Sequence, residues 1–195
     1  MSTRYETEGF GPPFTAEEYR DRLRRVRAEM EKRDLDTLFV TSPPNITYLT
    51  GYDSIWYDLP VITALVVRRD ADNAIFFDTR FHRELVADSA YADEIVYHGG
   101  RGVRAIIGTL EQRGWLKGNV GIEKWSRSPA PPVLADLEMR FTDAGANVVD
   151  GSWCVDRVKL VKMPSEITYI RRASDIADAA MIAVRDALKP GITEK

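Results

Sequence analysis

The segment Ser42-Pro43-Pro44-Asn45-Ile46-Thr47-Tyr48-Leu49-Thr50-Gly51-Tyr52 decides the fold of this chain. It follows the short apolar run Leu38-Phe39-Val40, which is typical of a strand covered on both faces. The prolines stiffen a turn and suit the first positions of a helix, and a glycine commonly ends one. The segment therefore predicts a strand, a tight turn and a short helix in succession.

The residues before this segment predict an amphipathic helix over 16–32. Thr15 can cap the helix, with Glu18 completing a capping box, and Phe14 and Tyr19 occupy the two positions of a hydrophobic staple. An apolar stripe at spacings of four, three and four follows one face of the helix. The stripe consists of Tyr19, Leu23, Val26 and Met30.

The residues after the segment predict strands and helices in alternation. Strands are expected at 61–67, 74–77, 94–97, 120–122 and 146–149. Helices are expected at 81–88, 103–112 and 131–139. A hairpin turn at 70–73 joins two of the strands. The pattern predicts an α/β fold, with a mixed, mainly parallel sheet flanked by helices.

The end of the chain differs in character. A short helix is predicted at 153–160, and Pro164 opens a long helix that Lys189-Pro190-Gly191 terminates. At about 1.5 Å per residue this helix is roughly 37 Å long. Thr193-Glu194 then resembles the cap of another helix. We therefore expect the chain to be the front part of a longer protein.

Composition excludes several classes of function. The net charge is -3, with 29% charged and 44% hydrophobic residues, so no basic surface for nucleic acid is expected. No apolar stretch reaches the roughly 20 residues that span a bilayer, and no signal peptide is recognised. Cys154 is the only cysteine and is interpreted as a buried thiol. A cytoplasmic location, with no membrane association, is the simplest expectation.

The sequence offers no convincing catalytic centre. The two histidines, His82 and His98, lack partners at metal-ligand spacing; His82 is interpreted as a surface or rim residue and His98 as structural. The segment Gly99-Gly100-Arg101-Gly102 precedes a helix but matches neither a P-loop nor a dinucleotide fingerprint. Ser126 and Ser128 lack the context of a nucleophile elbow. No metal or other cofactor is therefore expected to bind this chain.

The loop 52–60 carries the candidate site residues. Aromatic side chains on a loop normally cover something or bind something, because exposing them is unfavourable. They either pack on their own domain or edge a ligand site or an interface. The candidate substrate-gating residues are Asp53, Trp56, Tyr57 and Asp58.

The segment 45–52 resembles the N-terminal domain of the creatinase/prolidase/aminopeptidase P family, the pita-bread metallopeptidases. The likeness extends to the opening helix, to 156–167, which is similar to the family's linker, and to 189–194. The resemblance implies a ribonuclease H-like N-terminal domain over 1–156. It also implies that 157–195 hold the linker and the first helix of a C-terminal pita-bread catalytic domain.

The resemblance further implies a two-domain, metal-dependent Xaa-Pro dipeptidase or aminopeptidase. In such enzymes two divalent metals (Mn, Co or Zn), held by Asp, Asp, His, Glu and Glu, activate a water for attack on the amide. Those ligands would lie beyond Lys195, so this fragment alone is expected to be inactive. The partners implied are the chain's own catalytic domain and a second subunit in a homodimer. The loop that carries Trp56, Tyr57 and Asp58 would reach the active site of that second subunit.

The substrate remains open between a small peptide and an osmolyte. Creatinase carries an arginine in this loop that binds the substrate carboxylate, whereas the loop of this chain contains Asp53 and Asp58 but no Lys or Arg. An acidic and aromatic edge suits an amine or another cation better. Ectoine hydrolase-like and creatinase-like members are therefore alternatives to a peptidase, with creatine itself disfavoured. A stand-alone binding module without chemistry is the other alternative.

Overall fold

The structure is a computed structural model that describes residues 13–54, 57 and 61–193. The chain divides into two compact units, Met1–Lys159 and Leu160–Lys195. The first unit contains the sheet and its covering helices, and the second consists largely of one long helix.

The first unit is built on one six-stranded sheet with the order β4-β3-β2-β1-β5-β6. The pairs β1–β5, β5–β6 and β3–β4 are parallel, whereas β1–β2 and β2–β3 are antiparallel. This topology confirms the predicted mixed, mainly parallel sheet. The strands are β1 (Thr37–Val40), β2 (Ala64–Arg68), β3 (Ala74–Thr79), β4 (Glu94–His98), β5 (Gly118–Ile122) and β6 (Ala146–Asp150).

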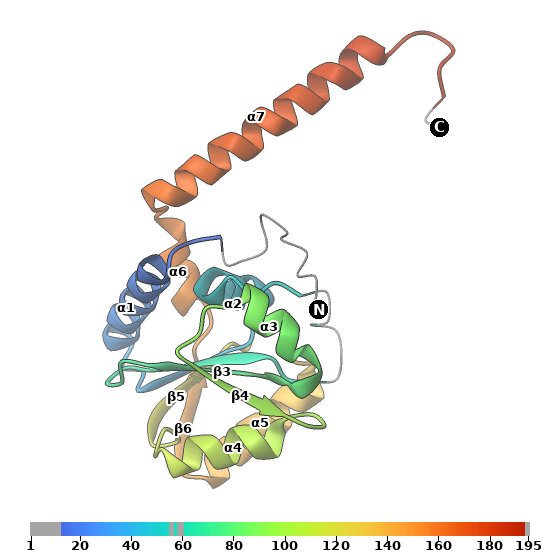
Figure 1. Ribbon diagram of the computed structural model, residues 1–195. Helices are drawn as coiled ribbons and strands as arrows, with labels where there is room; N and C mark the ends of the chain where they lie inside the picture. The colour runs from blue at the N-terminus through green and yellow to red at the C-terminus, as the bar shows by residue number, and fades with distance from the viewer. Residues whose placement is uncertain (1–12, 55–56, 58–60, 194–195) are drawn as a thin grey trace, which may run out of the picture. The chain divides into compact units, whose positions relative to one another are not determined.

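Helices cover both faces of the sheet, which gives three layers (Figure 1). One face carries α1 (Ala16–Lys32), α2 (Pro43–Thr50), α3 (Arg83–Ser89) and α6 (Cys154–Leu160). The opposite face carries α4 (Val103–Gln112) and α5 (Pro131–Asp143). Consecutive parallel strands need crossover connections, which α3 supplies between β3 and β4 and α5 supplies between β5 and β6.

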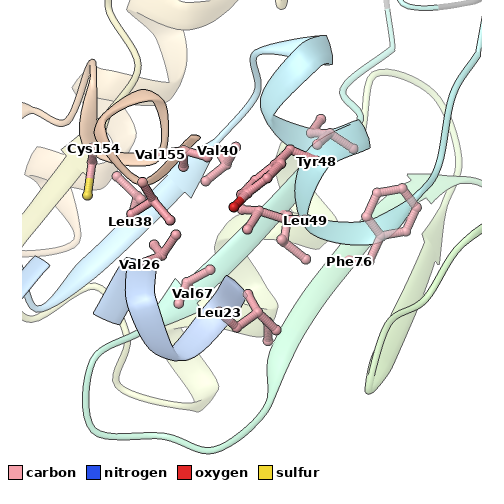
Figure 2. Close-up of a cluster of buried hydrophobic side chains, with 14 of the residues drawn as sticks. Leu23, Val26, Leu38, Val40, Tyr48, Leu49, Val67, Phe76, Cys154 and Val155 are labelled. Atoms are coloured by element: carbon pink, nitrogen blue, oxygen red, sulfur yellow. The ribbon is translucent and has the colours of Figure 1, made fainter. Parts of the chain in front are cut away.

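The central strand β1 is buried on both sides, as its apolar run predicts. Successive side chains of a strand point to opposite faces, so Leu38 and Val40 join one core and Phe39 joins the other. Figure 2 shows the first core, in which side chains of α1, α2 and α6 meet those of β1, β2 and β3. Its labelled members include Leu23, Val26, Leu49, Val67, Phe76 and Val155.

The local signals around the deciding segment are present as expected. Thr15 and Glu18 form the reciprocal capping box of α1, and the rings of Phe14 and Tyr19 pack edge to face at 6.1 Å. Helix α2 begins at its two prolines and ends at Gly51, whose φ of 77° is left-handed. Glycine adopts this conformation without steric penalty, which allows the chain to leave the helix there.

Several element boundaries differ from the prediction by a few residues, and two of these differences have a clear physical cause. The second strand begins at Ala64 rather than at residue 61, because the backbone N–H of Ile62 donates to Arg101 O (3.2 Å) instead of to a neighbouring strand. The segment expected to be one helix from 81 begins as the 3-10 turn η2 (Arg80–His82), capped by Thr79, and continues as α3. Periodicity alone does not reveal such side-chain caps.

The second unit contains the long helix α7 (Pro164–Ala187). Glu166 accepts a hydrogen bond from Met163 N (2.8 Å) at its start, where an acidic side chain is favourable. Its apolar side chains, including Ile170, Ile176 and Val184, are exposed. Among the residues that the structure describes, no helix is both long and apolar enough to cross a membrane.

Candidate functional site

The loop that follows α2 contains the four candidate residues predicted from the sequence. Trp56 and Asp58 lie outside the described residues. Asp53 is exposed, directly after the buried Tyr52. Tyr57 is half-buried and packs against the core beneath α2. The described part of the loop thus combines one exposed carboxylate, Asp53, with the two inward-facing aromatic side chains of Tyr52 and Tyr57.

Tyr57 attaches the loop at two points. Its hydroxyl donates to Tyr52 O (3.3 Å), and its ring packs edge to face on the ring of Tyr52, with centroids 6.1 Å apart. Its backbone carbonyl accepts from Ser128 Oγ (3.3 Å) in the loop after β5. Burial raises the pKa of the Tyr57 hydroxyl, so this group remains a hydrogen-bond donor at neutral pH.

A buried polar network lies at the base of the loop. Asp78, at the end of β3, has no exposed surface and accepts hydrogen bonds from Tyr52 Oη (2.7 Å) and Thr63 Oγ1 (3.0 Å). The backbone N–H of Thr79 (2.7 Å) and the Nδ1 of His82 (3.1 Å) also contact this carboxylate. Because these donors come from separate segments, Asp78 ties the loop to the sheet.

The electrostatics of this network follow from the burial of Asp78. A buried carboxylate needs hydrogen bonds or a counter-charge. Burial, followed by the bond to Asp78, raises the pKa of Tyr52. The interpretation of His82 as a surface or rim residue is wrong, because its side chain is only 11% exposed and contacts Asp78. The turn η2 directs this imidazole inward, which the sequence neighbours Arg80 and Arg83 did not indicate.

A second polar cluster joins β1, β5 and α2. Glu123 directly follows β5 and is 3% exposed. Its Oε2 accepts from the backbone N–H groups of Thr41 (2.7 Å) and Ser42 (2.6 Å), and its Oε1 accepts from Asn45 Nδ2 (2.6 Å). Burial raises the pKa of Glu123, while these three donors act in the opposite direction.

Asn45 connects this cluster to α6. Its Nδ2 also donates to Asp156 Oδ2 (3.1 Å), and its Oδ1 accepts from Lys159 Nζ (2.7 Å). The side chain therefore bridges two carboxylates and one ammonium group. The sequence analysis missed Glu123, Asn45 and Asp156 as a group. A polar residue directly after each buried strand was the signal that could have predicted this group. The carboxyl ends of the parallel strands β1 and β5 lie at the same edge of the sheet, so polar residues that follow them come close together.

The remaining sequence candidates have structural partners. His98 is buried, and its Nε2 donates to Ile62 O (2.8 Å). Ser126 Oγ donates to Ser128 O (2.6 Å). The side chain of Cys154 is buried, which confirms the interpretation as a buried thiol, and burial raises its pKa to about 11. The glycine segment 99–102 directly precedes α4, and its residues Gly99, Arg101 and Gly102 line a surface pocket of about 520 Å³.

Comparison with known proteins establishes the family. Residues 22–161 match the creatinase/prolidase N-terminal domain. The chain belongs to this family. An ectoine hydrolase from Halomonas elongata is 28% identical over 92% of this chain and 47% of its own length. A creatinase from a Bacillus species is 28% identical over 94% of this chain and 43% of its own length.

Solved structures agree with the family's fold. An Xaa-Pro dipeptidase from Bacillus anthracis superposes with a TM-score of 0.71 at 20% identity, over 90% of this chain and 45% of that one. The match supports the same architecture for this creatinase/prolidase N-terminal domain. The chain spans about half the length of the curated relatives it matches.

Proposed function

We propose that this creatinase/prolidase N-terminal domain gates substrate access in an Xaa-Pro dipeptidase-like metallohydrolase. The reactive centre would lie in a C-terminal catalytic domain, with 157–195 contributing the linker and the first helix of that domain. In this proposal the domain also takes part in a homodimer, and the loop 52–60 borders the active site of the second subunit. The proposal rests on the family and on the construction of this loop.

The anchoring of the loop is the observation that carries the proposal. Tyr52 is fixed to Asp78 in the sheet, and Tyr57 is fixed both to Tyr52 and to Ser128. Anchoring Tyr52 and Tyr57 in this way lowers the entropy that these two residues lose when a substrate is bound. Asp53 is exposed on this loop. The domain thus supplies positioning and charge rather than reactive atoms.

The metals that the family resemblance implies find no ligands in the described residues. No three His, Cys, Asp or Glu side chains come together there in an arrangement that could hold a metal ion. The carboxylates Asp78 and Glu123 are engaged by protein donors instead.

An osmolyte or another amine-containing substrate is the second candidate, in place of an Xaa-Pro peptide. The exposed carboxylate of Asp53 favours a cationic substrate group, and an ectoine hydrolase is among the similar proteins. Under this alternative the domain has the same gating role, and only the substrate changes. Hydrolysis of an Xaa-Pro dipeptide panel and of cyclic and linear osmolytes by the longer protein distinguishes the two.

The gating role is tested in the longer protein that carries this domain. Replacing both loop aromatics, Trp56→Ala with Tyr57→Ala, should lower kcat/KM on the order of tenfold or more, because the substrate would lose its positioning. Phe81→Ala is the matched control, since Phe81 is an aromatic residue 85% exposed in η2 rather than in this loop. Unchanged turnover in the double variant would rule out the gating proposal.

A further inference from the structure

Two exposed tryptophans stand side by side at the carboxyl edge of the sheet. Trp125 is 75% exposed and Trp153 is 53% exposed, and their ring centroids are 5.9 Å apart at an interplanar angle of 50°. Trp125 follows β5, and Trp153 follows β6. Large aromatic side chains usually gain stability by burial, so an adjacent pair left exposed indicates a binding surface.

The backbone around the pair is fixed by hydrogen bonds. Trp125 N donates to Ser152 Oγ (3.2 Å), which joins the two loops, and Arg33 Nη1 donates to Ser152 O (2.8 Å). Trp153 has a φ of 67°, in the left-handed region that bulky residues rarely adopt. Residues in such strained conformations are often found at binding sites.

The two indoles border a small polar pocket of about 110 Å³. Since a water molecule takes up about 30 Å³ of liquid volume, the pocket accommodates a group of only a few heavy atoms. Its floor includes the carboxylates of Glu123 and Asp156. The other lining residues are Ser42, Asn45, Ser126 and Ser152.

The charge around the pocket favours a cation. Glu123 and Asp156 contribute two carboxylates, and Lys159 Nζ lies 3.4 Å from Asp156 Oδ1 and 2.7 Å from Asn45 Oδ1. Asp156 remains partly exposed, with 36% of its side chain accessible. The faces of indole rings attract cations, and they do so more strongly than other aromatic side chains.

We propose that Trp125, Trp153 and Asp156 form a binding site for a small alkylated ammonium group. The two rings desolvate the methyl groups of the cation, and the carboxylate of Asp156 balances its charge. The group can belong to a free solute or to a methylated lysine of another protein, since both present the same chemistry. The proposed site contains no residue of the loop 52–60, and the proposal does not depend on the gating role.

Ligand-observed NMR with tetramethylammonium tests the site on the full chain of 195 residues. Saturation transfer to the methyl signal should give a dissociation constant on the order of 1 mM, as expected for two cation–π contacts and one ion pair. Uncharged tert-butanol should neither bind nor compete, because it lacks the positive charge. Absence of transfer from the chain to tetramethylammonium would overturn the proposal.

Three variants locate the binding. Trp125→Ala and Trp153→Gly should each weaken binding on the order of tenfold, and Asp156→Asn several-fold. Glycine is chosen at 153 because it adopts positive φ freely, so the variant should fold. Phe81→Ala, which removes an exposed aromatic ring from η2, is the control and should bind normally. Equal binding by all variants would place the cation elsewhere and refute the site.

A second pair of probes distinguishes the two sources of the cation. A short peptide containing trimethyl-lysine is compared with tetramethylammonium, and with the same peptide carrying unmodified lysine. Binding of the methylated peptide about tenfold tighter than the free ion supports a protein ligand, whereas equal affinity supports a free solute. Preference for the unmodified lysine would contradict the alkylated-ammonium proposal.

Discussion

Replacing Asn45 with alanine removes three hydrogen bonds at the junction of α2, β5 and α6. The side chain of Asn45 is almost fully buried and donates to Glu123 (2.6 Å) and Asp156 (3.1 Å) while accepting from Lys159 (2.7 Å). The bond to Glu123 matters most, because it satisfies a buried acceptor. Asp156 and Lys159 are partly exposed, so they can bond to water or to each other in the variant.

The expected loss is about 2–3 kcal/mol of unfolding free energy, since a hydrogen bond to a buried charged group contributes about 1.5–3 kcal/mol. For a chain of this size, that loss lowers Tm by about 4–12 °C. The assay is urea unfolding monitored by circular dichroism, with a thermal melt alongside. The m-value should not change, because the buried surface is nearly the same.

Asn147→Ala is the matched control. Asn147 lies exposed on β6, where its Nδ2 donates to Asn119 Oδ1 (2.7 Å), and its loss should change stability by no more than about 0.5 kcal/mol. A third variant, Asn45→Asp, brings a further carboxylate between Glu123 and Asp156. The pKa of that new carboxyl would rise, so the destabilisation should grow from pH 4 to pH 8. If Asn45→Ala were as stable as Asn147→Ala, the polar junction would have no role in holding the domain together.

Three further predictions follow from buried groups. Tyr52→Phe should cost about 1.5–3 kcal/mol in chemical unfolding, because Asp78 loses a donor in a site without solvent; a cost near zero would contradict this account. Cys154 should react with a thiol reagent at neutral pH only after unfolding in urea, since burial raises its pKa to about 11; rapid reaction of the native chain would refute the assignment. Burial raises the pKa of Glu123 in the folded state above its ordinary value of about 4.3. Protonation of Glu123 therefore contributes fully to the unfolding free energy below a pH of about 4.3, and this contribution is lost as the pH rises through the folded-state pKa. Between about pH 4.3 and the raised folded-state pKa, the unfolding free energy of Glu123→Gln should therefore depend less on pH than that of the unmodified chain. The same pH dependence in both proteins would argue against a raised pKa for Glu123.

Local patterns made the fold predictable. The run Leu38-Phe39-Val40, the capping box of Thr15 and Glu18, and the glycine at 51 each act over a few residues, so they are visible in the sequence. Alternation of strands and helices then restricts the architecture to a covered α/β sheet. The start of β2 was mispredicted because it is set by a distant partner, through the bond from Ile62 N to Arg101 O.

The polar clusters were not predictable in the same way. Asn45 and Glu123 are 78 positions apart and meet only because β1 and β5 pair in parallel. His82 turns towards Asp78 because of the short turn η2, a conformation that its charged neighbours did not indicate. Trp125 and Trp153 likewise become neighbours only when β5 pairs with β6. The Asn45–Glu123 and Trp125–Trp153 contacts therefore depend on strand pairing, whereas the His82–Asp78 contact depends on a local turn.

The chemical role of the domain is tested most directly by assaying this chain alone. The purified 195-residue chain is incubated with Mn²⁺ and a panel of Xaa-Pro dipeptides, and both hydrolysis and bound metal are measured. The account predicts no turnover above background and no stoichiometric metal, because in the proposed function the reactive centre belongs to a separate catalytic domain. Dipeptide hydrolysis by this chain, accompanied by stoichiometric metal, would contradict it.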